Sequence, residues 1–200
     1  EKITTLAREY FALPEDADVI TYDGRAYLNA ADEKYDVIMV DAYQDITIPF
    51  QMSSIEFFTL VKEHLTDDGV MVVNMNMRGK EEGNINQYLA DTIAGVFGEV
   101  YTADVPGSTN RELYASNSGR MIESFDAGRD KLSNPDFSEL MERVSMGLLA
   151  YQPGNYLLTD DKAPVEVLGM QVIDDLIEDE IEYYKNIFQR DGIKGLLNGM

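Results

Sequence analysis

The sequence predicts an α/β domain with a mostly parallel sheet, and three observations lead to this fold class. Short β-branched runs alternate with segments whose apolar residues recur every three or four positions, the period of an amphipathic helix. The run 35–41, YDVIMVD, has a continuously apolar centre, which is typical of a parallel strand covered on both faces. With 200 residues and a hydrophobic fraction of 44%, the chain can form one globular domain with a sizeable core.

Apolar spacing and turn residues define the first elements. The apolar positions within 3–11 predict a helix that ends at Leu13-Pro14, because the residue before a proline disfavours helical geometry. The β-branched run Asp18–Tyr22 predicts a short strand, which leads through Asp23-Gly24 into a short helix around Leu28. The strand over 35–41 follows this helix.

The later elements continue the alternation of helix and strand. Ser53 and Glu56 fit a capping box at the start of a helix that continues to Leu65. An Asp-Gly turn at 68–69 then leads into a second buried-type strand over 70–77. The remaining pattern predicts a helix over 85–97, strands over 99–105 and 112–117 joined by a hairpin-like turn, and helices over 137–149 and 164–188.

Charge and composition exclude several classes of function. The chain has 16 Lys and Arg against 37 Asp and Glu, which gives a net charge of −21. Because phosphate groups are bound by clustered basic side chains, a nucleic-acid partner is excluded, and an anionic membrane surface would repel the chain. A cationic substrate remains open, although such a charge more often serves solubility. The absence of cysteine excludes disulfides, thiolate nucleophiles and cysteine-bound metal.

The sequence also lacks several motifs that would indicate other classes of protein. No apolar run reaches the ~18–20 residues that cross a bilayer, and no segment has the pattern of a signal peptide. The sequence contains no G-x-G-x-x-G, no P-loop and no His-based metal pattern. The single histidine, His64, is expected to be exposed on its helix.

Acidic residues follow two of the predicted strands. Asp23 comes directly after the strand over 18–22, and Asp41 ends the strand over 35–41. Ligands of open parallel sheets bind outside the carboxyl ends of the strands, so these two carboxylates would share one rim if both strands belong to one sheet. The alternative is structural: Asp before Gly forms turns, and an aspartate at a strand end can simply solvate a loop.

The loop 41–49, DAYQDITIP, has the composition of an amine-binding segment. Its carboxylates supply negative charge, and Tyr43 offers cation–π contact or hydrogen bonding. The alternative is an ordinary surface loop. A second acidic pair, Asp160-Asp161, is interpreted as the cap of the helix that begins at Pro164.

Together, three stretches resemble the polyamine aminopropyltransferases, the spermidine and spermine synthases: Glu9-Tyr10-Phe11, 23–28 (DGRAYL) and 35–41 (YDVIMVD). The chain is most similar to bacterial spermidine-synthase-like proteins, whose corresponding segments read like 41–50 and 158–166. The resemblance implies the class I S-adenosylmethionine-dependent methyltransferase fold. This is a Rossmann-like three-layer sandwich with a mostly parallel sheet, here truncated at its amino end.

The resemblance also implies roles for individual residues. Asp23 would accept a hydrogen bond from the adenine amino group of the co-substrate, with Gly24 beside it. Asp41 would contact the co-substrate and act as the base that deprotonates the attacking amine. The family's loop reads D-x-x-D-P where this chain reads D-A-Y-Q-D-I. Substrate binding would fall to Tyr43, Gln44 and Asp45.

The implied function is transfer of an aminopropyl group from decarboxylated S-adenosylmethionine to a small cationic amine, without a metal. Two other functions remain open: methyl transfer from S-adenosylmethionine, and a non-catalytic binding or assembly domain of a longer, membrane-anchored protein. The expected location is the cytoplasm, where the chain would be the soluble part if the whole protein is membrane-bound. No nucleic acid and no direct membrane insertion are expected, and a homodimer is left open.

The resemblance implies a single domain over 1–200 that lacks the family's first strand and glycine-rich loop, with a mainly helical part over 120–200. The missing loop is where backbone N–H groups approach the co-substrate. We therefore expect the isolated chain to bind co-substrate weakly and to be inactive. We also expect the central sheet to leave an edge open or to borrow a strand.

Overall fold

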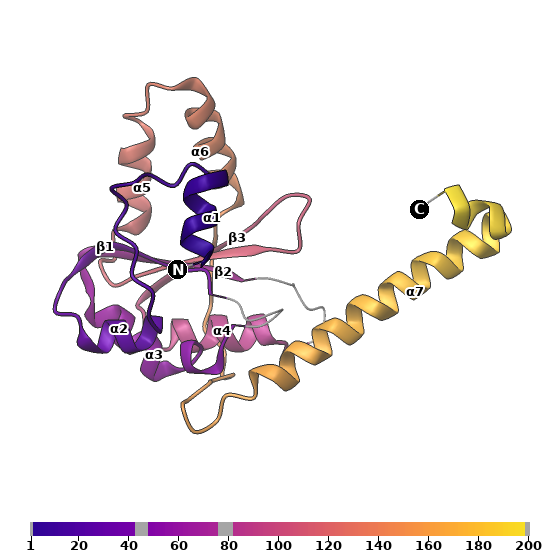
Figure 1. The fold of residues 1–200 in the computed structure, drawn as a ribbon, viewed down its shortest axis with the longest axis horizontal. Coiled ribbons are helices and arrows are strands. Elements are labelled where there is room, and N and C mark those ends of the chain that lie inside the picture. Colours follow the sequence, from indigo (N-terminus) through magenta and orange to yellow (C-terminus); the bar gives the residue numbers. More distant parts are fainter. Residues whose placement is uncertain (1, 43–47, 76–81, 199–200) are drawn as a thin grey trace. The chain divides into compact units, whose positions relative to one another are not determined.

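The computed structural model describes residues 2–42, 48–75 and 82–198, which fall into two compact units, 1–32 and 33–200 (Figure 1). The first unit contains helices α1 (Lys2–Tyr10) and α2 (Gly24–Ala30), as the apolar spacing predicts. Asp23 is the N-cap of α2, and its carboxylate accepts a hydrogen bond from the Ala26 N–H at 2.8 Å. Such a bond satisfies one of the free N–H groups in the first helical turn.

The prediction of a strand over 18–22 is wrong. This segment precedes α2 without joining the sheet formed by the described strands. A β-branched run becomes a strand only where another backbone offers donors and acceptors alongside it, so composition alone could not decide the outcome.

The second unit is built on a five-stranded sheet of order β1-β2-β4-β3-β5. Its strands are β1 (Tyr35–Val40), β2 (Leu65–Met75), β3 (Glu99–Asp104), β4 (Arg111–Ser116) and β5 (Leu149–Ala150). β1 and β2 are parallel, whereas the other three pairings are antiparallel. The described sheet is therefore mixed rather than mostly parallel. The short connection over 105–110 explains this, because a tight turn can join only antiparallel strands.

Helices cover both faces of this sheet, which gives the expected three layers (Figure 1). Alternate residues of β2, including Met71 and Val73, are fully buried on the face covered by α3 (Ile55–Glu63) and α4 (Ile85–Ala94). On the other face lie α5 (Met121–Arg129) and α6 (Pro135–Gly147). Between these two helices and the sheet is a largely apolar cavity of about 310 Å³, whose lining includes Tyr101 and Tyr114.

The start of α3 differs from the predicted capping box. The N-cap is Ser54 rather than Ser53, and its Oγ accepts from the Phe57 N–H at 3.3 Å. Ser53 instead donates to the carbonyl oxygen of Phe50, which begins the short helix η1 (Phe50–Met52). Glu56 accepts a hydrogen bond from the Asp160 N–H at 3.0 Å.

Asp160, predicted to cap the last helix, makes a contact with the start of α3 that its position before Pro164 does not suggest. Its carboxylate accepts a hydrogen bond from Ser54 Oγ at 2.5 Å, so it binds the start of α3. The two residues are 106 positions apart, a separation that a local capping rule cannot detect. The last helix, α7 (Val165–Asn198), begins after this junction and contains one residue of non-helical conformation, Gly192, with φ 63°.

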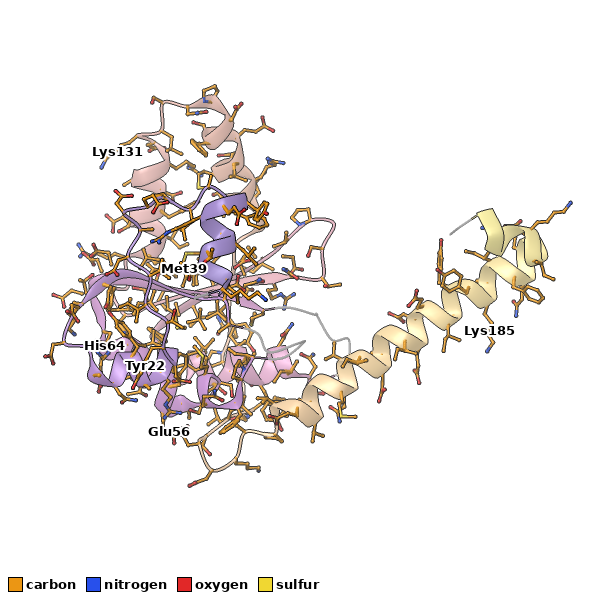
Figure 2. The ribbon with its side chains drawn as sticks, viewed as in Figure 1. Tyr22, Met39, Glu56, His64, Lys131 and Lys185 are labelled. Carbon is orange, nitrogen blue, oxygen red and sulfur yellow. The ribbon has the colours of Figure 1, made fainter. Side chains whose placement is uncertain are left out.

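β1 is an edge strand of the described sheet, with β2 as its neighbour. Its apolar side chains Val37 and Met39 are 55% and 74% exposed, and Met39 is labelled in Figure 2. An apolar sequence suited to a covered strand therefore lies at an edge.

Two further features bear on the sequence-based expectations. His64 is half-buried rather than exposed, and its Nδ1–H donates to the carbonyl oxygen of Leu60 at 2.8 Å. No helix within the described residues is both long enough and apolar enough to cross a membrane.

Candidate functional site

The carboxyl ends of the two parallel strands bring Asp41 and Asn74 together. Asp41 follows the last residue of β1, and Asn74 is the penultimate residue of β2. In the ladder Val40 pairs with Val73, which places the following residues side by side at the rim. Asn74 Nδ2 donates a hydrogen bond to Asp41 Oδ1 at 3.2 Å. The amide thus positions one oxygen of an exposed carboxylate.

Glu112 joins this pair from the adjacent strand. It is the partner of Asn74 in the antiparallel β2–β4 ladder, so it is a direct neighbour at the same rim. Burial and, second, the negative charge of Asp41 raise the pKa of the Glu112 carboxyl above its ordinary value. Two carboxylates therefore influence each other, with an amide between them. Mutual repulsion of this kind is relieved when a cation binds.

Asn74 also offers an unused acceptor. Its Oδ1 is buried and has no hydrogen-bond partner among the described residues. Buried polar atoms are normally bonded, so such an atom calls for a donor. We define the rim cluster as Asp41, Asn74 and Glu112. It presents carboxylate and amide oxygens, the groups that bind an ammonium ion, which is a donor without acceptors.

The positions of the predicted site residues fall into three groups. Asp41 is exposed at the carboxyl end of β1, as predicted. Asp23 and Gly24 lie in the first unit, where Asp23 caps α2 and Gly24 is the first residue of that helix. Tyr43, Gln44 and Asp45 lie outside the described residues, so their roles stay predictions.

Sequence reasoning missed Asn74 and Glu112. Asn74 could have been noticed, because a polar side chain follows the apolar run Val70–Val73 near a predicted strand end. Glu112 could not, because the sequence does not reveal that β4 lies beside β2 rather than beyond β3. Glu112 lies beside Asn74 only because β4 is the neighbour of β2 in the sheet.

A second missed cluster surrounds Asp91, which is 1% exposed on α4. Its carboxylate accepts hydrogen bonds from the Tyr151 hydroxyl at 2.6 Å, the Gly154 N–H at 2.9 Å and the Tyr156 N–H at 3.0 Å. Burial and the bond to Asp91 raise the pKa of the Tyr151 hydroxyl. These contacts fix the segment after β5 against α4. We assign Asp91 a structural role.

We looked for side-chain clusters that could bind a metal ion in the described part of the chain. There, no three His, Asp or Glu side chains gather in an arrangement that could hold a metal ion. The rim cluster has two carboxylates and an amide, whose oxygens are acceptors of the kind that an organic ammonium ion requires.

Comparison with known proteins identifies the family. The sequence model of the spermine/spermidine synthase domain matches residues 6–113. A probable polyamine aminopropyl transferase of Bifidobacterium longum is 50% identical over 217 residues, which cover 100% of this chain and 49% of that protein. The chain thus spans about half the length of this curated relative.

Solved structures with the same fold include a spermidine synthase in complex with the transition-state analogue AdoDATO. It has a TM-score of 0.55 at 18% identity, covering 70% of this chain and 53% of that one. Human methyltransferase-like protein 13 in complex with SAH also has a TM-score of 0.55, at 21% identity, covering 73% of this chain and 66% of that one. These likenesses confirm the methyltransferase-like α/β fold. With the match over 6–113, they lead to one conclusion: the chain belongs to the spermine/spermidine synthase family.

Proposed function

We propose that the full-length protein transfers an aminopropyl group from decarboxylated S-adenosylmethionine to an amine, with Asp41 as the base. The observation that carries this proposal is the rim cluster, in which Asn74 Nδ2 donates a hydrogen bond to Asp41 at 3.2 Å and Glu112 lies beside Asn74. The 50% identity to a probable polyamine aminopropyl transferase supports it.

The chemistry requires a group that first binds and then deprotonates the amine. An alkylamine has a pKa near that of lysine, about 10.4, so it arrives protonated and cannot attack. A carboxylate beside it binds the cation and takes its proton during attack. Asp41 suits this role because it is exposed at the rim and oriented by Asn74.

The bond changes balance without a further reactant. The bound co-substrate supplies a carbon activated by the neighbouring sulfonium. The amine nitrogen forms a bond to this carbon as the carbon–sulfur bond breaks, and methylthioadenosine leaves as a neutral thioether. The proton released from the nitrogen passes to Asp41.

The proposal also assigns binding roles to residues other than Asp41. Glu112 holds the ammonium ion opposite Asp41, with Asn74 Oδ1 as a further acceptor. We also assign adenine binding to Asp23 and Gly24, and substrate binding to Tyr43, Gln44 and Asp45, as the resemblance to the family implies.

The test is identification of the product formed by the full-length protein. The protein is incubated with a set of diamines and either decarboxylated S-adenosylmethionine or S-adenosylmethionine, and the products are analysed by mass spectrometry. We expect an aminopropylated amine and methylthioadenosine from the decarboxylated form alone. A methylated product from S-adenosylmethionine, or no product from either, would contradict the proposal.

A change at Glu112 separates amine binding from proton transfer. We expect Glu112→Gln to raise KM for the amine about tenfold with little change in kcat, because a charge-assisted hydrogen bond to the ammonium ion is lost. The raised pKa of Glu112 determines how KM for the amine changes with pH. As pH falls, this carboxyl is protonated earlier than an ordinary glutamate, so KM of the wild type rises and KM of the variant rises less.

The same change should slightly stabilise the fold at neutral pH. A carboxyl whose folded pKa is raised binds protons more readily in the folded state, so its contribution to stability falls as pH rises. Glu112→Gln cannot carry the charge, so the variant avoids this loss of stability as pH rises.

Glu63→Gln, an exposed position at the end of α3, is the matched control for Glu112→Gln. An unchanged KM in Glu112→Gln would remove Glu112 from the site.

A further inference from the structure

α7 carries an apolar stripe that the described structure leaves uncovered. Near its start, Val165, Leu168 and Val172 are buried, on the side that packs toward α4. Five large apolar side chains along another side of the helix are about half exposed or more: Val167 60%, Met170 63%, Ile177 49%, Ile181 56% and Phe188 50%. Tyr183, 57% exposed, lies on the side of Val165 and does not belong to this set. The exposed set thus forms its own stripe, separate from the buried one.

The spacing of this stripe is that of a coiled-coil seam. The seam positions are 167, 170, 174, 177, 181, 184 and 188, which alternate steps of three and four, and all of them are apolar or aromatic except Asp174. Steps of this kind repeat every 3.5 residues and keep one side of a helix facing a partner helix. At 100° per residue, the seam lies on the side of α7 opposite Val165, Leu168 and Val172. Packing against α4 therefore leaves the seam available.

Charge along α7 distinguishes the two ways in which such helices can pair. Six of the nine residues over 174–182 are acidic, and none is basic. The following part contains Lys185, labelled in Figure 2, and Arg190. Two parallel copies would place the acidic segments side by side. Two antiparallel copies place each acidic segment against the more basic part of the other.

We propose that α7 pairs with the α7 of a second copy of this chain in an antiparallel coiled coil. In the register that fills the seam, Ile181 packs against the partner's Tyr184, and Ile177 packs against the partner's Phe188. The twofold axis repeats both layers, which gives four apolar layers between 177 and 188. These layers cover the exposed apolar side chains of the middle of α7.

Side chains that flank the seam fit this register. Glu178 lies beside the partner's Lys185, and symmetry provides the pair twice. At the end of the seam, Asp174 approaches the partner's Asp191. In each copy Asp191 is 2.8 Å from Arg190, which offsets the repulsion there. A parallel pair would instead oppose Asp174 to its own equivalent within the seam and set Glu180 beside Lys185.

Analytical ultracentrifugation of the full-length protein tests the proposal. We expect twice the mass of one chain at high micromolar concentration. Ile181→Glu should shift the sample to one copy, because it places a carboxylate in the central layer. Ile193→Glu changes an equally apolar and exposed side chain of α7, 67% exposed and beyond Gly192, and should leave the dimer intact. A monomeric wild type, or a dimer that survives Ile181→Glu, would overturn the proposal.

Charge reversal tests the direction of pairing. Lys185→Glu should weaken the dimer about tenfold, because two attractive pairs become repulsive. Adding Glu178→Lys should restore the affinity in the antiparallel arrangement. Restoration by Glu180→Lys instead would indicate parallel helices and refute the register. The chain has no cysteine, so a mixture of Glu178→Cys and Lys185→Cys chains should also form a disulfide between the two kinds of chain, and neither kind should do so alone.

Discussion

Asp41→Asn in the full-length protein is expected to lower kcat by roughly 10²–10⁴-fold, the contribution of a positioned general base. An asparagine cannot accept the proton that leaves the amine nitrogen. It retains an oxygen that can accept the hydrogen bond from Asn74, so the geometry of the rim is kept. Steady-state kinetics with decarboxylated S-adenosylmethionine and the preferred amine measure the effect.

β1 itself provides a matched control for this change. Asp36 has the same residue type, is also exposed, and accepts one side-chain hydrogen bond, from Thr66 Oγ1 at 2.9 Å. It lies at the opposite end of the strand from Asp41, away from the rim. Asp36→Asn should leave kcat unchanged, and both variants should unfold at the wild-type temperature. Full activity in Asp41→Asn would exclude Asp41 as the base and would leave the family assignment intact.

Asp91→Ala is expected to destabilise the fold by about 1–3 kcal/mol, the cost of leaving the hydrogen-bond partners of a buried carboxylate unpaired. The carboxylate is almost completely buried and accepts three hydrogen bonds, so its loss leaves three donors without an acceptor. Urea unfolding monitored by circular dichroism measures the change in the free energy of unfolding. Asp67→Ala, an exposed aspartate in β2, should change it by less than about 0.5 kcal/mol.

Gly154 offers a second test of the same contact. A Cβ atom at this position would overlap Asp91 Oδ2, so Gly154→Ala must displace the carboxylate or the loop. We expect a loss of about 1–3 kcal/mol. The double variant should lose less than the sum of the two single changes, because removing the carboxylate makes room for the methyl group. Additive losses would show that the two positions act independently.

The periodicity of the sequence predicted most helices and strands of the second unit correctly. The hairpin of β3 and β4 and helices α3, α4 and α6 follow from local patterns that need no knowledge of neighbours. The strand over 18–22 failed because a strand depends on its partners. Local patterns placed the N-cap of α3 one residue early and could not detect the bond of Ser54 to Asp160, 106 positions away.

The site was predicted in part for the same reason. Asp41 could be found because it ends an apolar strand, and the end of a parallel strand is a position of known significance. Glu112 and Asn74 became neighbours only through the order of the strands. Asp91 gave a weak signal, as an acidic residue between Ala90 and Ile93 on the buried side of its helix. Its three donors come from a distant segment that no local rule connects to it.

The exposed edge of β1 has a consequence for how molecules of this chain behave in solution. Val37 and Met39 lie on a strand whose backbone can accept another strand, which is a starting point for uncontrolled association. The net charge of −21 opposes such encounters, because every approaching copy carries the same sign. The negative charge of the chain thereby reduces nonspecific association through the exposed edge of β1.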